Sequence, residues 1–401
     1  VYGLGFVGLT LAVTLASKGH IVIGSDVDQK LISKLSKGLP HIFEPRLQDM
    51  LQKTLFDSKL KFESKKSNEN SDIHIVCVGT PINNDGSASL DAIRSVTHSI
   101  SKNLNKDDLV MIRSTVPVGT TRDFILPILE KGSGLLVGKD FSLAFTPERT
   151  VEGNAIYEIL SLPQIVGGLT SMCTKKSSTF WQTITNNVIN LESVESAELV
   201  KLLNNSFRDL SFSFSNAFAI LAHKYNIDSN SVIQAANEGY PRNKIPKPSP
   251  GVGGYCLTKD PLLYSSTFKD LPHSRLAKSG RLANQEAAKY PLKVVEEYIL
   301  ERNLQMKNLN IVVSGLAFKG LPETNDLRSS TSIDVYRELE SKDANLFGFD
   351  AVVPNDLLEE YGIRSIESYK DLDRIDILLI LNNHPDNIQQ GFLSTIKEDF
   401  L

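Results

Sequence analysis

Apolar residues in the first half of the chain occur in short runs separated by stretches long enough to form helices. The runs lie at residues 20–26, 59–63, 72–81, 108–116, 141–148 and 163–168. Helix-length stretches such as 89–104 and 119–131 separate most of them. Buried strands that alternate with helices are typical of parallel α/β architecture. The pattern therefore predicts a doubly wound domain over residues 1–190.

The pattern changes after residue 190. Residues 193–227 contain no Gly or Pro over 35 positions. Apolar residues recur there at three- and four-residue steps: Leu199, Leu202, Leu203, Phe207, Leu210, Phe214, Phe218 and Leu221. This spacing predicts one long amphipathic helix, of the kind that spans between domains or packs against a partner subunit. With a Pro/Gly-rich loop at 239–254 and more helix at 276–302, it indicates a helical middle domain over 191–304.

The last hundred residues repeat the outline of the first. Residues 308–320 form an apolar run that leads into G-x-A-x-x-G, a later run at 345–350 ends in an acid, and a third lies at 376–381. The same order of features occurs at the start of the chain. We expect a second nucleotide-binding-like domain over 305–401. The predicted fold is α/β, with two Rossmann-like parallel-sheet domains joined by the helical middle domain.

Composition and charge exclude several classes of protein. The chain has 401 residues and a net charge of −4, with no basic stripe, which argues against nucleic-acid binding. No apolar run approaches the ~18 residues of a membrane span. Three scattered cysteines argue against a disulfide framework or a metal site and favour a reducing, cytoplasmic location. Because the chain opens at Val1-Tyr2, most of the strand expected before Gly3 is missing, as in a truncated start.

A glycine motif opens the chain in the context that binds dinucleotides. It consists of Gly3, Leu4, Gly5, Phe6, Val7 and Gly8. Such glycines permit a tight turn and a close approach of the backbone to a pyrophosphate at a helix N-terminus. Asp26 ends the next strand, where ribose hydroxyls would lie, and an acid there favours NAD over NADP. The alternative is that the glycines only pack the helix on the strand.

A cysteine follows three glycines in GVGGYCLTKDP, residues 251–261. The glycines allow a sharp turn before Cys256, and a helix start just after it would lower the pKa of the thiol. Lys259 would act in the same direction. These features can produce a nucleophilic thiolate. Local sequence alone leaves open the alternative of an inert, buried cysteine.

Other polar residues stand where a site could use them. Lys201 and Asn205 are four apart on the long helix and could stabilise an oxyanion, although such a pair is often a solvated helix face. Glu148 and Glu152 are another pair with this spacing, just past a strand end, where open α/β sheets place their sites. Thr115 also ends a strand.

Together these stretches resemble the UDP-glucose/GDP-mannose dehydrogenase family over essentially the whole chain. The matching stretches are GLGFVG (3–8), VGTP (78–81), STVPVGT (114–120), PERTVEG (147–153), AELVKLLNN (197–205), PGVGGYCLTKD (250–260), GLAFKG (315–320) and NDLRSS (325–330). The resemblance implies an NAD-binding domain, a helical dimerisation domain and a nucleotide-sugar-binding domain. It also implies a homodimer or a higher homo-oligomer formed through the central helix.

The family oxidises the C6 alcohol of a nucleotide sugar to a carboxylate with two NAD. The resemblance makes Cys256 the nucleophile, with Lys201 and Asn205 stabilising the oxyanion. It also implies that Asp260 and Thr115 position a water or relay protons. Glu148 would assist hydrolysis of the thioester. The implied cofactor contacts beyond the glycine motif and Asp26 are Thr80, Thr115, Glu152, Lys259 and Arg328. The implied substrate contacts are Glu148, Lys201, Asn205, Arg242, Ser249, Gly253 and Lys319.

Two short motifs favour one branch of the family. Pro-Glu-Arg at 147–149 and Tyr-Pro-Arg at 240–242 resemble the enzymes that oxidise UDP-N-acetylhexosamines, notably UDP-N-acetylmannosamine. In that branch Arg242 would reach the substrate of a partner subunit. Thr258 stands where the family usually has Pro, and Ala217 where Glu is common.

Three alternatives remain at this stage. The chain could oxidise UDP-glucose at C6, or it could be a one-step hydroxyacid dehydrogenase. It could also be a non-catalytic sensor of NAD or nucleotide sugar. A one-step dehydrogenase needs no cysteine and no second nucleotide-binding half, and both are present. Loss of Cys256, Lys201 or Asp260 would indicate a sensor, and all three are present.

Overall fold

The computed structural model describes residues 1–64, 71–83, 87–268 and 271–388. The chain divides into two compact units. The first consists of Val1–Asn204 with Leu262–Leu271, and the second of Asn205–Pro261 with Pro272–Leu401. The expected boundaries at residues 190 and 304 stay a prediction, and the end of the third expected domain, residues 389–401, lies outside the described residues.

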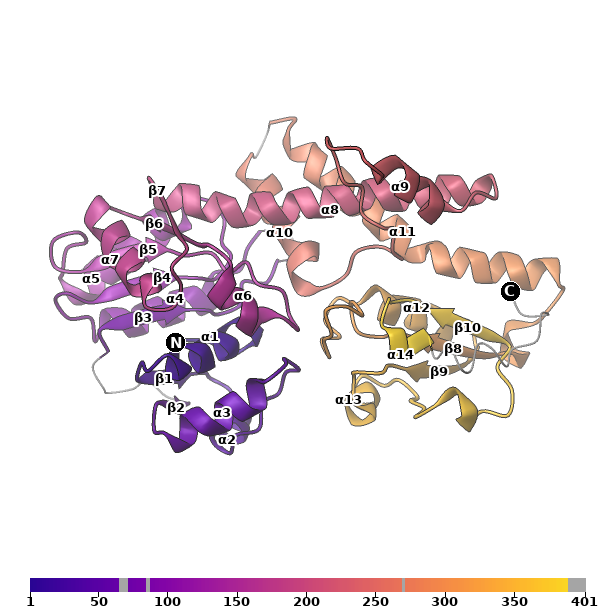
Figure 1. The fold of residues 1–401 in the computed structure, drawn as a ribbon, viewed down its shortest axis with the longest axis horizontal. Helices are drawn as coiled ribbons and strands as arrows, with labels where there is room; N and C mark the ends of the chain where they lie inside the picture. The colour runs from indigo at the N-terminus through magenta and orange to yellow at the C-terminus, as the bar shows by residue number, and fades with distance from the viewer. Residues whose placement is uncertain (65–70, 84–86, 269–270, 389–401) are drawn as a thin grey trace. The chain divides into compact units, whose positions relative to one another are not determined.

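The first unit is built on parallel strands that confirm the apolar runs. The strands are β1 (Val22–Ser25), β2 (Leu60–Glu63), β3 (Ile73–Val76), β4 (Leu109–Ile112), β5 (Ser142–Phe145), β6 (Gln164–Gly168) and β7 (Val188–Leu191). Five of them form a sheet in the order β3-β4-β5-β6-β7, and β1 pairs with β2 (Figure 1). Tyr2 bridges Ser25 and Val76, so the chain start occupies the strand position between β1 and β3.

The expected parallel α/β architecture is confirmed, and one pair of strands in the first sheet is antiparallel. β6 runs antiparallel to β5, with Phe145 opposite Gly167. Only the short helix α6 (Ala155–Ser161) intervenes between the two strands. β7, which was not predicted from the sequence, pairs parallel to β6.

Helices cover both faces of the first sheet. They are α1 (Phe6–Ser17), α2 (Gln29–Ser36), α3 (Leu47–Phe56), α4 (Asp91–Ser101), α5 (Leu126–Ser133), α7 (Ser171–Gln182) and the π-helical turn η1 (Thr120–Ile125). Successive residues of β4 point to opposite faces of the sheet and belong to two hydrophobic cores. Leu109 and Met111 pack with α1 and α7, whereas Val110 and Ile112 pack with α4 and α5. This alternation follows from the two-residue period of a strand.

The predicted long helix is α8, Val194–Lys224. Its early residues Val194 and Ala197 are buried in the core of the first unit. Farther along, Phe207, Phe214 and Leu221 are exposed although they are large and apolar. The helix is therefore amphipathic as expected, and part of its apolar surface faces solvent.

The second unit contains a three-stranded parallel sheet in the order β10-β8-β9. Its strands are β8 (Asn310–Ser314), β9 (Asn345–Phe349) and β10 (Ile377–Ile380). Its helices are α9 (Ser229–Asn237), α10 (Tyr255–Thr267, entering from this unit), α11 (Ser274–Glu301), α12 (Thr331–Glu340), α13 (Asn355–Glu360) and α14 (Pro385–Ile388), with 3-10 turns η2 (Met306–Asn308) and η3 (Tyr369–Asp371). All three strands fall within the predicted runs.

The two sheets share a local arrangement that the sequence repeat predicted. In the first unit the Leu4 N–H, in the glycine motif, donates to Asp26 Oδ2 at 2.8 Å. In the second unit the Ala317 N–H, in the corresponding motif, donates to Asp350 Oδ2 at 2.9 Å. Each acid follows the strand next to its motif and holds the loop of that motif by a backbone hydrogen bond. The repeat is therefore structural as well as sequential.

The central strand of the small sheet provides a test of the packing. Ile311 on β8 is fully buried, so Ile311→Ala is expected to lower the free energy of unfolding by about 2–5 kcal/mol. Leu300→Ala on α11, where the side chain is 81% exposed, is expected to change it by less than about 0.5 kcal/mol. Urea unfolding followed by circular dichroism measures both, and equal effects would contradict the assigned core.

Candidate active site

The glycine motif makes a turn that is closed on one side and open on the other. Gly3 has a φ of +86°, which favours glycine, and a Cβ on Gly8 would lie 1.8 Å from the Gly3 carbonyl oxygen. A Cβ on Gly5 would meet no atom within 4 Å. The tight side therefore needs Gly3 and Gly8, and the open side at Gly5 leaves room for a bound group.

The open side lies at the N-terminus of α1. Gly5 is the N-cap, and no side chain caps this end of the helix. Phe6 and Val7 form the first turn, where N–H groups and the helix dipole favour an anion. Asp26 Oδ1 accepts from the Asp28 N–H at 3.1 Å, and a carboxylate has further lone pairs for ribose hydroxyls. These residues fit a dinucleotide.

The loops after β3 and β4 are joined by a hydrogen bond. The hydroxyl of Thr80, which is buried, donates to the Thr115 carbonyl oxygen at 2.6 Å. The following turn is held by Glu198 on α8, which accepts from the Gly119 N–H at 2.6 Å and the Thr121 N–H at 2.9 Å. Burial raises the pKa of Glu198, and these hydrogen bonds only partly oppose it. The structure thus brings Thr80 and Thr115 together.

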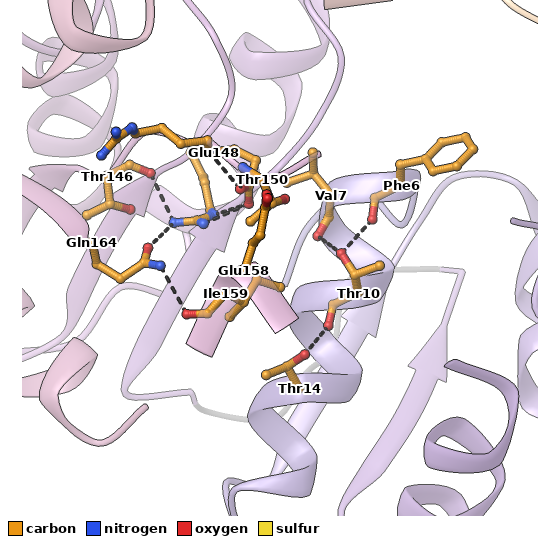
Figure 2. Close-up of polar contacts among 12 residues, drawn as sticks. Phe6, Val7, Thr10, Thr14, Thr146, Glu148, Thr150, Glu158, Ile159 and Gln164 are labelled. Atoms are coloured by element: carbon orange, nitrogen blue, oxygen red, sulfur yellow. Dashed lines mark hydrogen bonds and ion pairs between the residues drawn. The ribbon is translucent and has the colours of Figure 1, made fainter. Parts of the chain in front are cut away.

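Glu148 is the centre of a buried charged cluster, shown in Figure 2. Its Oε2 accepts from Arg113 Nε at 2.8 Å and lies 2.7 Å from Arg113 Nη2. Its Oε1 accepts from the N–H groups of Arg149 and Thr150, each at 2.7 Å. Arg113 also donates from Nη1 to Gln164 Oε1 at 3.2 Å. Both carboxylate oxygens of Glu148 are therefore engaged.

The electrostatic balance keeps Glu148 ionised. Burial alone acts to raise the pKa of Glu148, but the Arg113 charge, the Thr150 N–H and the Lys201 charge together lower it below its ordinary value. The Arg113 guanidinium also lies 4.7 Å over the Trp181 ring. Lys201 and Glu148, both predicted from the sequence, interact within the first unit.

The segment after Glu148 is a loop, so the spacing of Glu148 and Glu152 is not that of a helical pair. Helix α6 begins only at Ala155. Two other carboxylates hold this loop: Glu44 accepts from the Gly153 N–H at 2.8 Å, and Glu158 from the Val151 N–H at 2.8 Å. Glu152 lies half-buried in the turn between these two anchors.

The alternative that Lys201 and Asn205 form a solvated helix face is wrong. Their residues are only 7% and 6% exposed. Within the second unit, Asn205 Nδ2 donates to Asp260 Oδ2 at 2.6 Å. Asp260 is fully buried, and its Oδ1 lies 3.0 Å from Lys259 Nζ in an ion pair. The structure thus joins Asn205, Asp260 and Lys259 in one group.

Cys256 is exposed and lies in the first turn of α10. The helix begins at Tyr255, one residue before the cysteine, rather than just after it as expected. Gly251 and Gly254 have φ values of +73° and +85°, and a Cβ on Gly254 would lie 2.6 Å from the Phe318 ring. The glycines are therefore required both by the turn and by close packing against the C-terminal sheet region.

Several predicted ligand-binding residues surround this turn. Tyr255 has the charged ends of Lys259 and Arg328 at 5.4 and 5.2 Å from its ring centre. Gly253 packs against the Ser329 carbonyl oxygen, and Lys319 Nζ lies 5.5 Å over Phe318, the ring that covers Gly254. The Ser249 hydroxyl donates to the Gly251 carbonyl oxygen at 2.6 Å. Cations therefore gather near the cysteine turn.

Arg242, a predicted substrate contact, does not lie with the residues around the cysteine turn. Arg242 is exposed, and its hydrogen bond and ring contact in the described structure are with Tyr240, two residues earlier. Thr258, which replaces the usual Pro, is compatible with the helix: its N–H and its hydroxyl both donate to the Gly254 carbonyl oxygen, at 3.2 and 2.9 Å. A proline would lack the first of these hydrogen bonds.

Sequence analysis missed four charged residues that hold the site loops, namely Arg113, Glu198, Asp209 and Arg281. The signal for Arg113 was a charge inside the apolar strand run 108–116. For Glu198, Asp209 and Arg281 the signal was a charged residue at a helix position that packs against neighbouring elements. A buried charge must be paired, so such residues point to specific contacts.

Neither a metal site nor a membrane-spanning helix is found in the described ranges. No group of three or more His, Cys, Asp or Glu residues there could hold a metal ion. Nor is any described helix long and apolar enough to cross a membrane.

Removing the arginine of the buried pair tests the cluster. Arg113→Met leaves the Glu148 carboxylate buried without its counter-charge and is expected to lower the free energy of unfolding by about 3–5 kcal/mol at pH 7. Arg122→Met breaks a surface pair with Glu195, and we expect a loss of no more than about 1 kcal/mol. Denaturant unfolding of the two variants and the parent gives both values.

The same variant has a defined pH dependence. In the parent the pKa of Glu148 lies below its ordinary value of 4.5, so its stabilisation is present above the unfolded pKa and is lost as the pH falls through the folded pKa. In Arg113→Met burial dominates and raises the pKa of Glu148, so stability declines as the pH increases. The difference between parent and variant should be larger at pH 7 than at pH 4; a difference that does not change with pH would disprove the assigned pairing.

Comparison with known proteins places the chain in a family. The UDP-glucose/GDP-mannose dehydrogenase family matches in three parts: its NAD binding domain at residues 1–185, its central domain at 195–286 and its UDP binding domain at 312–398. The UDP-N-acetyl-D-mannosamine dehydrogenase of Pyrococcus horikoshii is 32% identical over 96% of this chain and 89% of its own length. The enzyme of the same name from Campylobacter jejuni is 31% identical over 97% and 96%.

A solved structure extends the likeness to the fold. The UDP-D-ManNAc dehydrogenase structure from Pyrococcus horikoshii superposes with a TM-score of 0.88, at 30% identity, and covers 96% of this chain and 89% of that one. Family, sequence and fold agree, and the glycine loop fits the cofactor. The chain belongs to the UDP-glucose/GDP-mannose dehydrogenase family and is an NAD-dependent nucleotide-sugar dehydrogenase.

Proposed function

We propose that this chain oxidises the C6 hydroxyl of a UDP-N-acetylhexosamine, namely UDP-N-acetylmannosamine, to the uronic acid in two successive two-electron steps. The observation that carries the proposal is Cys256: an exposed thiol in the first turn of α10, the helix that also carries Lys259 and the Asp260 carboxylate bound by Asn205. A one-step dehydrogenase or a non-catalytic sensor has no use for a thiol in this setting.

The chemistry balances with the groups that the chain supplies. When bound at the glycine motif, NAD would supply the hydride acceptor for each of the two oxidations, with a second NAD replacing the NADH formed in the first. The first oxidation converts the C6 alcohol to an aldehyde, with loss of one proton. The Cys256 thiolate adds to the aldehyde carbon to give a thiohemiacetal, whose oxidation gives a thioester. Water then cleaves the carbon–sulfur bond, which releases the carboxylate and regenerates the thiol.

Lys201 and Asn205 stabilise the negative oxygen that forms at C6. A side-chain amide carries two N–H donors, and the described structure uses one of those of Asn205 to reach Asp260. The second can therefore serve the oxyanion. Lys201 supplies a positive charge from a buried position, where electrostatic effects are stronger than in water.

Asp260 accepts the proton that the attacking water loses, and Thr115 positions that water. Asp260 is held by Asn205 on one oxygen and by Lys259 on the other, so its orientation is fixed. Glu148 assists hydrolysis as a permanent anion that orders the loop from Arg149 to Thr150. Its four contacts and lowered pKa support this role rather than that of a proton carrier.

Cofactor and sugar nucleotide are recognised by different sets of residues. The proposed NAD contacts are Gly3, Gly5, Phe6, Val7, Gly8, Asp26, Thr80, Thr115, Glu152, Lys259 and Arg328. The proposed sugar-nucleotide contacts are Glu148, Lys201, Asn205, Ser249, Gly253 and Lys319, with Arg242 acting on the substrate of a partner subunit. The cations near the cysteine turn support the binding of a diphosphate.

The names of the relatives favour UDP-N-acetylmannosamine, since the Pyrococcus horikoshii and Campylobacter jejuni proteins both carry that substrate in their names. We also propose that the product supplies uronic acids for a surface polysaccharide. UDP-glucose is the competing substrate, and the experiment below separates the two.

The reaction predicts a fixed ratio of NADH to sugar. We expect purified protein to form two NADH for each UDP-N-acetylmannosamine consumed, followed by absorbance and by mass spectrometry of the product. UDP-N-acetylglucosamine, UDP-glucose and GDP-mannose serve as competing substrates in parallel. One NADH per sugar would overturn the thioester route, and a preference for UDP-glucose would overturn the substrate assignment.

A cysteine variant separates the chemistry from cofactor binding. Cys256→Ser is expected to abolish formation of the uronic acid while NAD binding, measured by calorimetry, changes by less than about twofold. Cys173→Ser, at a buried cysteine on α7, is the matched control and should retain acid formation. Full acid formation by Cys256→Ser would refute the assignment of the nucleophile.

We further infer that two copies of this chain associate through α8. Phe207, Phe214 and Leu221 recur every seven residues, which places them on one stripe of the helix, and they are 69%, 66% and 54% exposed. An apolar stripe of this length is uncommon on a monomer. A second copy can bury it against the same stripe under two-fold symmetry.

Light scattering after size-exclusion chromatography tests the dimer. The parent is expected to run at about twice the 44.3 kDa mass of one chain. Phe207→Glu combined with Phe214→Glu should shift it to one chain, because charges are not tolerated in the apolar core of an interface. Phe56→Glu, at an exposed residue on α3, should leave the mass unchanged. A monomeric parent, or a dimeric double variant, would overturn the inference.

A further inference from the structure

Arg281 is a buried arginine of the second unit that lies beneath the cysteine turn. It belongs to α11 and is 5% exposed. Its Nη2 donates to the Val252 carbonyl oxygen and its Nη1 to the Leu257 carbonyl oxygen, each at 3.2 Å. These two carbonyl groups flank Cys256 and the glycines that precede it. One guanidinium group therefore connects both ends of the turn.

The charge of Arg281 is balanced by Asp209 on α8. Arg281 Nη1 donates to Asp209 Oδ1 at 2.5 Å, and Asn284 Nδ2 donates to the same oxygen at 2.8 Å. Both Asp209 and Asn284 are fully buried. Burial raises the pKa of Asp209, and Arg281 is the main group opposing it. The pair thus fixes the guanidinium between two helices.

The same network reaches the other end of the loop. Asn216 Nδ2 donates to Asn284 Oδ1 at 3.0 Å, and Asn216 Oδ1 accepts from the Ser249 N–H at 2.8 Å. The backbone from Ser249 to Leu257 is therefore held at three points by side chains of α8 and α11. None of these contacts involves the thiol itself.

We propose that Arg281, supported by Asp209, is a positioning residue that sets the place of the Cys256 thiol by holding the Val252 and Leu257 carbonyl groups. The proposal rests on the proposed function, in which Cys256 is the nucleophile. It adds a residue that touches neither sugar nor cofactor and acts through the backbone alone.

The composition of the turn explains why such a tether is needed. Gly251, Gly253 and Gly254 leave the backbone more conformational freedom than any other residue would. A thiol on a loose turn would populate many positions, and displacement by about 1 Å can cost about 10²-fold in rate. A guanidinium group has five N–H donors in a fixed planar fork, so it can bind two separate carbonyl oxygens and a carboxylate at once, which favours Arg over the compact ammonium of Lys.

The test compares Arg281→Lys and Arg281→Met with the parent. Lys keeps the charge opposite Asp209 but cannot reproduce both carbonyl contacts, so we expect a kcat lowered roughly tenfold and a KM for NAD within about twofold. Arg281→Met should lower kcat further. Arg275→Lys and Arg275→Met, at an exposed arginine on the same helix, are the matched controls and should behave as the parent.

A second measurement does not depend on the sugar. The rate of alkylation of Cys256 by iodoacetamide, followed by mass spectrometry of its peptide between pH 6 and pH 9, reports the setting of the thiol directly. Burial raises the pKa of Cys77 to about 12, and Cys173 is buried, so both should react slowly. We expect the pH profile of Cys256 alkylation to shift in Arg281→Lys and in Arg281→Met, and to stay unchanged in the Arg275 variants.

The outcomes separate the positioning role from the proposed function. If the parent oxidises no nucleotide sugar but the alkylation profile shifts in Arg281→Lys, the proposed function fails and the positioning role stands. If Arg281→Lys has the kcat and the alkylation profile of the parent, the positioning role is overturned. Where circular dichroism shows that Arg281→Met does not fold, Arg281→Lys decides the result.

Discussion

The loops of this protein depend on a single physical constraint, which is that a charge removed from water must be paired. Arg113 with Glu148 in the first unit and Arg281 with Asp209 in the second are buried arginine–carboxylate pairs. Each pair also makes hydrogen bonds to the backbone of a loop or turn that carries proposed catalytic residues. The cost of burying the charges is offset only when these contacts are complete, so the loop conformations are closely specified.

Carboxylates hold loops elsewhere in the chain by the same means. Glu44, Glu158 and Glu198 each accept from backbone N–H groups of a loop at the carboxyl edge of the first sheet. Asp26 and Asp350 do so for the two glycine motifs. A carboxylate accepts several hydrogen bonds at once, which makes it an efficient anchor for polypeptide that has no regular secondary structure. These carboxylates thus fix the loops that follow the strands.

The sequence predicted the regular elements well because their periodicity is local. The apolar runs located β1 to β6 and β8 to β10, and the three- and four-residue spacings located α8. The direction of β6 could not be predicted, because the pairing of distant strands leaves no local pattern. The strand β7 was missed because half of its residues are exposed and its run is short. The burial of Lys201 and Asn205 likewise depends on what packs against their helix, which periodicity does not reveal.

The reversed direction of β6 decides which end of that strand serves the site. In a parallel arrangement the last residues of β6 would project beyond the carboxyl edge of β5. Because β6 runs the other way, its first residue, Gln164, lies there and accepts a hydrogen bond from Arg113. The reversed direction of β6 thus provides a hydrogen-bond acceptor for Arg113, the arginine that is paired with Glu148.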